Sequence, residues 1–435
     1  MAGGRRHPEA QRSWLRPLLA RLAAGVHGCG GSRRSPGINL VGYVTGALGL
    51  GVAARNTLAM LASSGRPFTA VDIDPGGGRQ GADLAWQWAL ADPPAAPHAV
   101  NWFHMNPPEL AALLASDRGW LVTRSRTNVC VPFWELPRLP PAGAWIDCLG
   151  AMNLVLAPSR FILDAIRTSA PHVPVVHYPQ TVVLPRGVAA GRAAFGLPDG
   201  AVLFHVAADV SSDLDRKNPL AVVRAFRDAF PAGQAVGLVL KLAQTRAGHP
   251  WADTAPLLAA AAGHPGVHVI DRDLSYVDAV SLAASCDVCV SLHRSEGLGL
   301  GMLEAMTMGK PVIATAWSGN MDFTTDATAC LVGVDLVPVR ARHPAYQPEI
   351  IGPGQVWAEP RHAEAVTWMR RLAANACLRA EIGGRARHFA DALRGRVLGG
   401  EVLGSVDRAA LAAQATGRRW WSCRVSGSGL ASGSG

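Results

Sequence analysis

Ser295-Glu-Gly-Leu-Gly-Leu-Gly-Met-Leu-Glu304 links an apolar run at 288–292 to a helical pattern at 301–308. A strand, a glycine-rich turn and a helix in this order form the repeating unit of a parallel α/β sheet. Glycines let the backbone approach a ligand closely, and free N–H groups at a helix start favour an anion such as a diphosphate. The segment therefore predicts an anion-binding turn at the carboxyl end of a parallel strand.

Two glutamates flank this turn. Glu296 precedes the glycines, and Glu304 lies eight positions later, within the predicted helix. Carboxylates are poor phosphate ligands because like charges repel, but they accept hydrogen bonds from hydroxyl groups. The pattern suits a ligand with a diphosphate in its middle and hydroxyls at each end, such as a nucleotide sugar. A glycine-rich turn with two solvated glutamates is the alternative interpretation.

Similar strand and helix patterns extend over most of the chain. In the first half, strands are predicted at 38–44, 67–73, 100–103, 120–122, 154–156 and 174–177, with helices at 52–61, 108–115 and 160–168. In the second half, strands are predicted at 201–206, 236–242, 267–270, 288–292 and 311–315, with helices at 219–230, 277–284, 301–308, 361–379 and 381–394. This alternation predicts the α/β class, with two doubly wound parallel-sheet domains that face a cleft.

A stretch rich in proline and glycine at 180–199 is a plausible linker between the two halves. We therefore divide the chain into four predicted parts: a basic leader (1–35), an N-terminal domain (36–190), a C-terminal domain with closing helices (191–395), and a helix with a flexible Gly/Ser tail (396–435).

Charge is concentrated at the two ends of this 435-residue chain. Of the net charge of +9, residues 1–35 contribute +6 and residues 415–435 contribute +3. A neutral body argues against nucleic acid as a partner, whereas basic ends suit an anionic membrane surface. The leader is interpreted either as an interfacial amphipathic helix or as a disordered, loosely docked segment.

The cysteines and the apolar runs exclude other classes. Cys286 and Cys289 form a C-x2-C pair, but no second pair at zinc-site spacing exists, so no metal is predicted. Eight cysteines in 435 residues indicate buried thiols in a reducing cytoplasm rather than a disulfide scaffold. No apolar run is long enough for a transmembrane helix.

Several ordered blocks together resemble the retaining GT-B glycosyltransferases that carry a Glu-x7-Glu motif, the glycosyl transferase group 1 family that includes glycogen synthase-like and mannosyltransferase-like enzymes. The blocks lie within about 38–395 and are Val41–Tyr43, Gly49–Arg55, Phe133–Pro137, Asp209–Pro219, His293–Leu300, Trp317–Asn320 and Trp357–Pro360. The resemblance implies GT-B architecture, with the N-terminal domain on the acceptor side and the C-terminal domain binding a nucleotide sugar.

The resemblance also implies roles for individual residues. Glu296 would bind hydroxyls of the transferred sugar, Lys217 would pair with the diphosphate and steady the leaving group, and Glu304 would bind the ribose. The remaining donor-binding residues would be Gly49, Gly51, Arg216, His293, Gly297, Leu298, Gly299 and Leu300. The family often has an arginine five or six positions before the lysine; Ser212 and Ser211 occupy those positions here, which leaves the role of Arg216 open.

Three residues of the N-terminal half are further candidates. His104 follows a predicted strand and is either a catalytic residue facing the cleft or a structural histidine. Trp134 and Glu135 are candidates for acceptor binding, although Glu135 is equally suited to pairing with Arg138.

The implied activity is transfer of a hexose, with retention, from a UDP- or GDP-sugar to a hydroxyl of a glycan or glycolipid. The departing phosphate would take the acceptor proton, and no metal or further cofactor would be needed. Such an enzyme would serve polysaccharide biosynthesis in the cytoplasm, and the basic leader allows peripheral contact with the inner face of the membrane.

Three other functions stay open. A dehydrogenase is suggested by Gly46, Gly49 and Gly51 followed by Asp72 or Asp74, but their order is G-x-x-G-x-G rather than G-x-G-x-x-G. A nucleotide-sugar epimerase shares the GT-B fold and differs in its product. A non-catalytic scaffold at a carbohydrate or membrane surface would bind ligand without turnover.

Overall fold

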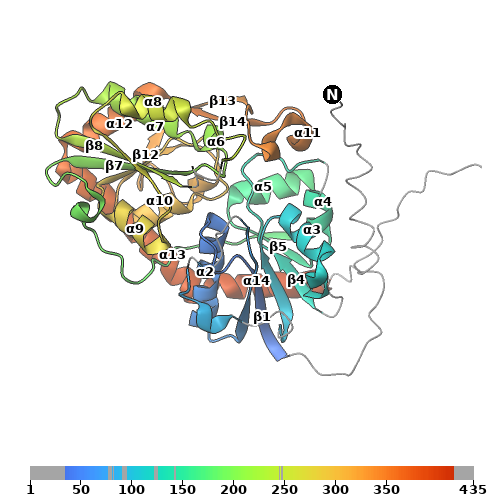
Figure 1. Cartoon of the computed structure of the whole chain (residues 1–435). Helices are drawn as coiled ribbons and strands as arrows, with labels where there is room; N and C mark the ends of the chain where they lie inside the picture. Colours follow the sequence, from blue (N-terminus) through green and yellow to red (C-terminus); the bar gives the residue numbers. More distant parts are fainter. Residues whose placement is uncertain are drawn as a thin grey trace, which may run out of the picture.

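The computed structural model describes residues 35–415, except for 77–80, 82, 91–95, 122–125, 142–143, 244 and 246–247. The predicted basic leader up to residue 34 and the Gly/Ser tail from residue 416 lie outside the described residues. Two lobes are visible, each built around a sheet with helices on both sides (Figure 1).

The first lobe contains a parallel sheet whose strand order, within the described residues, is β2-β1-β3-β4-β5-β6. The strands are β1 (Ser35–Gly42), β2 (Phe68–Asp72), β3 (His98–His104), β4 (Thr127–Cys130), β5 (Leu154–Ala157) and β6 (Val175–His177). Its crossover helices are α2 (Gly49–Ser63), α3 (Pro107–Ala115), α4 (Ala144–Gly150) and α5 (Arg160–Ser169). Parallel strands require such crossovers, which bury both faces of the sheet.

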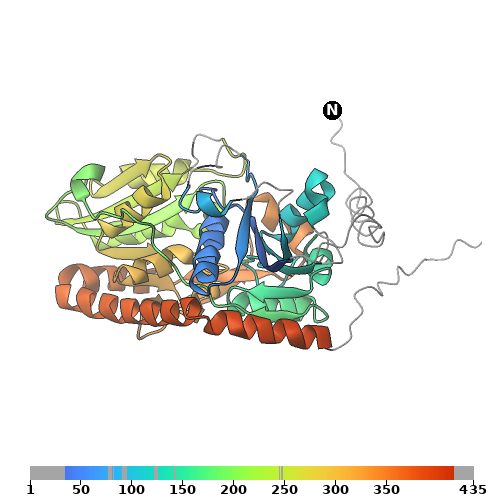
Figure 2. The ribbon, with the colours of Figure 1, turned by 90° about the horizontal axis from the view of Figure 1, so that it is seen from below.

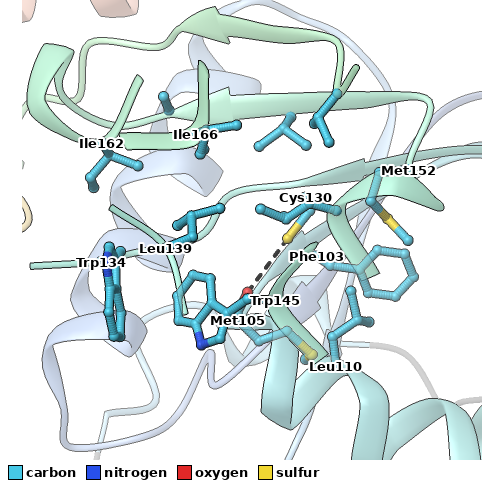
Figure 3. Close-up of a cluster of buried hydrophobic side chains, with 14 of the residues drawn as sticks. Phe103, Met105, Leu110, Cys130, Trp134, Leu139, Trp145, Met152, Ile162 and Ile166 are labelled. Atoms are coloured by element: carbon cyan, nitrogen blue, oxygen red, sulfur yellow. Dashed lines mark hydrogen bonds between the residues drawn. The ribbon is translucent and has the colours of Figure 1, made fainter. Parts of the chain in front are cut away.

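Neighbouring residues of one strand enter different hydrophobic clusters. Trp102 packs in the cluster on one face, and Phe103 packs in the cluster on the other face. Alternation with period two is the geometry of a strand buried on both sides. Figure 3 shows the cluster of Phe103, in which the Cys130 thiol donates to the Met105 carbonyl at 3.6 Å.

One predicted strand is wrong. Residues 117–121 form a 3-10 helix rather than a strand that begins at 120, and the strand of the sheet is β4 at Thr127–Cys130. Asn128 of β4 accepts from Asn101 Nδ2 at 2.9 Å, and Asn101 accepts from Asn39 Nδ2 at 2.9 Å. These hydrogen bonds satisfy the buried side-chain amides inside the sheet. The polar Asn128 can therefore lie within β4, and a search for apolar runs misses this strand.

The second lobe contains a parallel sheet with the order β12-β11-β10-β7-β8-β9 in the described part of the chain. Its strands are β7 (Val202–Asp209), β8 (Val236–Ala243), β9 (Val267–Asp271), β10 (Val288–Ser291), β11 (Val312–Thr315) and β12 (Cys330–Val332). Its helices are α6 (Leu214–Lys217), α7 (Pro219–Ala229), α8 (Ala255–Ala262), α9 (Tyr276–Ala284), α10 (Leu300–Thr307), α12 (His362–Ala374) and α13 (Ala376–Leu398). The two sheets confirm the predicted α/β class.

Two segments that follow the second sheet reach back to the first lobe. An antiparallel hairpin of β13 (Val334–Pro338) and β14 (Val356–Pro360) carries α11 (Pro348–Ile351) in its loop. Tyr346 and Ile351 of this loop belong to the hydrophobic cluster of the first lobe that contains Phe103.

The C-terminal helix α14 (Glu401–Ala415) follows α13 and packs Val402, Leu403 and Val406 into the cluster on the other face of the first sheet. In Figure 2, α13 and α14 follow one another along the lower edge of the picture, across both lobes. None of the helices in the described residues is long and apolar enough to cross a membrane.

Candidate functional site

A cleft of about 1240 Å³ lies between the two lobes and is lined by residues from both. The turn after β1, the loop after β4 and the start of α3 form its first wall, and residues that follow β7, β9 and β10 form the second. Ligands of open parallel sheets bind at the carboxyl ends of the strands, which is where this cleft lies. Its volume exceeds the ~300–1,000 Å³ of ordinary small-molecule pockets.

The glycine turn after β10 forms the floor of the cleft. Gly299 has φ of 93°, a left-handed conformation that glycine adopts without strain, and α10 begins at the next residue. The segment around Gly319 packs so closely that a Cβ there would lie 2.0 Å from the Gly297 carbonyl oxygen. Ser159 of the first lobe donates to that same carbonyl at 2.6 Å. The turn is thus fixed by contacts from both lobes.

The residues of this turn face the cleft. Gly297, Leu298, Gly299 and Leu300 all line the cleft, as does Gly49 of the opposite wall. Gly51 does not belong to the lining: a Cβ there would lie 2.4 Å from the Gly46 carbonyl oxygen, so this glycine lets α2 pack against the turn after β1.

Glu296 and Lys217 form an ion pair in the cleft. Lys217 Nζ lies 2.5 Å from Glu296 Oε1, and Arg216 Nη1 lies 3.4 Å from Glu296 Oε2. Burial raises the pKa of the Glu296 carboxyl, but the two cations outweigh it and lower this pKa to about 2. Glu296 is therefore a carboxylate at every physiological pH.

Local structure places Lys217 at this point. Asp213 caps the short helix α6 by accepting from the backbone N–H groups of Asp215 and Arg216. Asn218 then ends the helix in a left-handed conformation with φ of 52°, and Pro219 begins α7. Because α6 ends here, Lys217 projects from a turn at the carboxyl end of the second sheet.

Arg216, whose role the sequence left open, lies in the site. Its side chain is buried, with Nη1 donating to the Ser295 carbonyl at 2.9 Å. Its Nη2 lies 3.9 Å from Glu135 Oε1 in the first lobe. The Tyr346 hydroxyl donates to the other oxygen of Glu135 at 2.8 Å. Arg216 thus joins Glu296 of one wall to Glu135 of the other.

Glu135 does not pair with Arg138, which corrects one of the two readings of this residue. Arg138 Nη2 donates instead to the Pro353 carbonyl at 2.8 Å. Trp134 also lines the cleft, and its ring centroid lies 4.7 Å from that of Trp145. Trp134 is only 3% exposed, so its ring supports this wall from within the core of the first lobe.

Glu304 lies at the other end of the cleft, on α10. Burial raises the pKa of its carboxyl to about 7, although the Tyr276 hydroxyl and Arg55 partly oppose this rise. The Tyr276 hydroxyl donates to Glu304 Oε1 at 2.8 Å. Near neutral pH, both protonation states of Glu304 are populated.

Two predicted histidines are not among the residues that line the cleft. His104 is fully buried at the end of β3 and is not one of the cleft-lining residues, and burial lowers its pKa to about 3. His293 is fully buried as well; its ring lies 2.9 Å from Ser291 Oγ and 3.0 Å from Asn320 Oδ1. His293 therefore fastens the loop after β11.

Sequence reasoning missed three side chains of the cleft, namely Arg55, Tyr276 and Tyr346. Arg55 lies at the end of the glycine block Gly49–Arg55, so the pattern contained it without indicating its role. The two tyrosines stand in segments with no motif. Within the described residues, no group of three or more His, Cys, Asp or Glu side chains is placed to hold a metal ion.

Comparison with protein families gives a match between residues 233–341, about a quarter of the chain, and the family described as Glycosyl transferases group 1. The matched segment contains the glycine turn, Glu296 and Glu304. A search of curated proteins gives no match.

Several solved structures are similar over most of the chain. Sucrose-phosphate synthase from Thermosynechococcus elongatus is 15% identical, with a TM-score of 0.59 over 87% of this chain and 100% of that one. HepE from Anabaena, solved with UDP-glucose, is 14% identical, with a TM-score of 0.58 over 86% and 100%. The α,α-trehalose 6-phosphate synthase from Burkholderia multivorans is 12% identical, with a TM-score of 0.57 over 88% and 99%.

At these identities the structural likeness concerns the fold, while the family match concerns one segment of the second lobe. The chain thus has the GT-B fold, two parallel α/β domains that face a cleft, and its residues 233–341 carry the sequence pattern of group 1 glycosyl transferases.

Proposed function

We propose that this protein is a retaining glycosyltransferase that moves a hexose from a UDP- or GDP-sugar to a hydroxyl of a glycan or glycolipid. The observation that carries the proposal is the Lys217–Glu296 ion pair at the glycine turn of the interdomain cleft. The match of this segment to group 1 glycosyl transferases and the GT-B fold of the chain support it.

Lys217 and Glu296 serve the two halves of such a donor. A bound donor places its phosphates beside the Lys217 ammonium and its sugar hydroxyls beside the Glu296 carboxylate. The nucleoside diphosphate leaves as an anion, so a cation fixed beside it stabilises the transition state. Glu296 is ionised at neutral pH and accepts hydrogen bonds from the sugar throughout the reaction.

The bond changes balance without a further reagent. The bond between the anomeric carbon and the phosphate oxygen breaks, and a bond to the acceptor oxygen forms on the same face of the sugar. The acceptor proton passes to the departing phosphate oxygen. Trp134 and Glu135 form the acceptor side of the cleft, and Glu304 accepts from the ribose. His104 has no part in this proposal because it lies outside the cleft lining.

Ligand binding tests the donor assignment. UDP, GDP, ADP and NAD are titrated against the wild type, Glu304→Ala and the control Glu381→Ala, whose side chain is exposed on α13. A ligand at ~100 times its Kd adds about 2.7 kcal/mol to the free energy of unfolding. We expect UDP or GDP to stabilise the wild type and the control but not Glu304→Ala. A response to NAD alone would make the protein a dinucleotide-binding enzyme.

Product analysis tests the reaction. Incubation with the matching nucleotide hexose and a panel of glycosides should give a new glycoside whose anomeric coupling in NMR equals that of the donor. A glycoside of opposite configuration would overturn retention. A new nucleotide sugar formed without acceptor would identify an epimerase, and binding without any turnover would identify a scaffold.

A further inference from the structure

Arg55 is a buried cation of the cleft that the proposed reaction has not used. It projects from α2 of the first lobe, is 6% exposed and lines the cleft. Its Nη1 donates to the carbonyl oxygens of Val44 at 2.9 Å and Gly46 at 3.2 Å. Its Nε lies 2.9 Å from Asp83 Oδ2. These contacts engage two of the three guanidinium nitrogens, Nη1 and Nε.

The third nitrogen of the guanidinium, Nη2, has no such contact with the described residues. Within the part of the chain that the structure describes, Arg55 Nη2 is buried and has no hydrogen-bond partner. Leaving a buried charged donor unsatisfied is costly, so such groups are normally paired. A guanidinium nitrogen without a partner, on a side chain that lines a cleft, is suited to donate to a phosphate oxygen.

Tyr276 connects Arg55 to the second lobe. The Arg55 guanidinium lies 5.2 Å from the centre of the Tyr276 ring, in the range of a cation–π contact. The hydroxyl of the same ring donates to Glu304 Oε1 at 2.8 Å. A chain of contacts therefore runs from α2 of one lobe through Tyr276 to Glu304 of the other.

The other basic side chains of the cleft already face carboxylates. A nucleoside diphosphate carries at least two negative charges, whereas the positive charges of Arg216 and Lys217 already face Glu296 and Glu135. Lys241 and Lys310 also line the cleft, and aspartates oppose their charges, namely Asp209, Asp271 and Asp273 for the first and Asp287 for the second. Arg55 also faces a carboxylate, that of Asp83, but its Nη2 is a buried donor without a hydrogen-bond partner among the described residues, as is Arg216 Nε.

We propose that Arg55 and Tyr276 complete a nucleoside diphosphate subsite that spans both lobes: Arg55 Nη2 donates to the phosphate next to the ribose, and the Tyr276 hydroxyl holds Glu304 for the ribose. The inference rests on the proposed function, because it names two further residues of the same donor site. It adds a side chain of the first lobe to the residues that bind the nucleotide.

The test compares ligands that differ only in phosphate. UDP, UMP and uridine, or the guanosine series if GDP is the ligand, are titrated by calorimetry, with competition for the weak nucleoside. In Arg55→Gln, a donor to the Val44 and Gly46 carbonyls remains but the charge is lost. We expect diphosphate and monophosphate affinities to fall at least tenfold and nucleoside affinity to change less than twofold. Arg55→Lys should recover part of the loss.

Asp83→Asn is the matched control, because it breaks the ion pair of Arg55 without removing the arginine. We expect this variant to bind the diphosphate as tightly as the wild type or more tightly. If Asp83→Asn reproduces the loss, or if Arg55→Gln weakens nucleoside and diphosphate equally, Arg55 merely fastens the turn after β1 and the inference fails. Unchanged diphosphate affinity in Arg55→Gln would also overturn it.

Tyr276→Phe tests the other residue. Loss of its hydroxyl acts at the ribose end, so affinities for nucleoside, monophosphate and diphosphate should fall by a common factor of about three to ten. Equal affinities of this variant and the wild type for all three ligands would remove Tyr276 from the subsite.

The two proposals fail in different ways. If the wild type binds UDP or GDP and Glu304→Ala does not, the donor site is supported. If Arg55→Gln then binds the diphosphate as tightly as the wild type, only the present inference fails. If the wild type binds no nucleoside diphosphate at all, the proposed function fails and the subsite fails with it.

Discussion

Glu296 and Glu304 are the same residue type, eight positions apart on one segment, yet their environments differ in charge. The pKa of Glu296 is lowered to about 2 despite burial, because Lys217 and Arg216 face it. The pKa of Glu304 is raised to about 7 by burial, with the Tyr276 hydroxyl and Arg55 opposing the rise. Arg55 is itself held by Asp83, which weakens its influence on Glu304.

The difference shows that spacing along the chain places the two carboxylates, while segments far away in sequence set their charge. The end of the cleft assigned to the transferred sugar has a permanently charged acceptor. The end assigned to the ribose has an acceptor whose charge changes near neutral pH. Four predictions test this contrast.

Removal of the charge at Glu296 should have the largest effect. Glu296→Gln keeps the shape of the side chain but leaves the charges of Lys217 and Arg216 uncompensated. We expect kcat to fall by about 10²–10³-fold, as for the loss of one preorganised electrostatic contact, with nucleotide affinity within a few-fold of the wild type. A variant that keeps more than a tenth of the kcat would contradict the assignment of the sugar to this end.

Removal of Lys217 should have the next largest effect and should make the two carboxylates more alike. Lys217→Gln takes away the cation that contributes most to lowering the pKa of Glu296. We expect kcat/KM to fall about 100-fold. We expect the acidic limb of kcat at saturating donor to move to higher pH, because Glu296 then protonates more readily. A pH profile with an unmoved acidic limb would show that Lys217 does not govern the charge of Glu296.

Nucleotide affinity should depend on pH through Glu304. The ionised carboxylate accepts from the ribose hydroxyls, and with a pKa of about 7 its ionised fraction rises from about a tenth at pH 6 to about nine-tenths at pH 8. Titration calorimetry with UDP or GDP should therefore show up to tenfold tighter binding at pH 8. In Glu304→Gln this dependence should be lost; if it persists, another group is responsible.

Stability should show the smallest of these effects. The folded state holds the Glu304 proton more tightly than the unfolded chain does. Ionisation of this carboxyl therefore costs no stability below about pH 4.5. Its cost then grows with pH and levels off above about pH 7. We expect Glu304→Gln to raise the free energy of unfolding by about 1 kcal/mol at pH 8 and to change it little at pH 5, because the side chain is only half-buried.

Urea unfolding at the two pH values measures this difference, with Glu381→Gln as a reference. Glu381 pairs with Arg385 on the exposed face of α13, and such pairs contribute roughly 0.3–0.5 kcal/mol. An equal gain at both pH values in Glu304→Gln would mean that the effect does not come from the ionisation of this carboxyl.

The sequence predicted the features that have a local cause. Apolar runs followed by glycine turns located most strands of both sheets, and the spacing of Glu296 and Glu304 located the cleft floor. β4 was missed because Asn128 is satisfied by an amide from another strand, which no local pattern reveals. The contact of Arg55 with Tyr276 joins positions 221 residues apart and likewise had no local signal.

The hairpin loop that brings Tyr346 and Ile351 into the core of the first lobe affects how the molecule melts. These residues leave that core if the second lobe unfolds, and full burial of such a side chain is worth roughly 1.5–3 kcal/mol. The α14 helix adds Val402, Leu403 and Val406 to the opposite cluster, although the chain reaches it through the second lobe. The two halves of this protein should therefore lose their structure together, in one calorimetric transition rather than two.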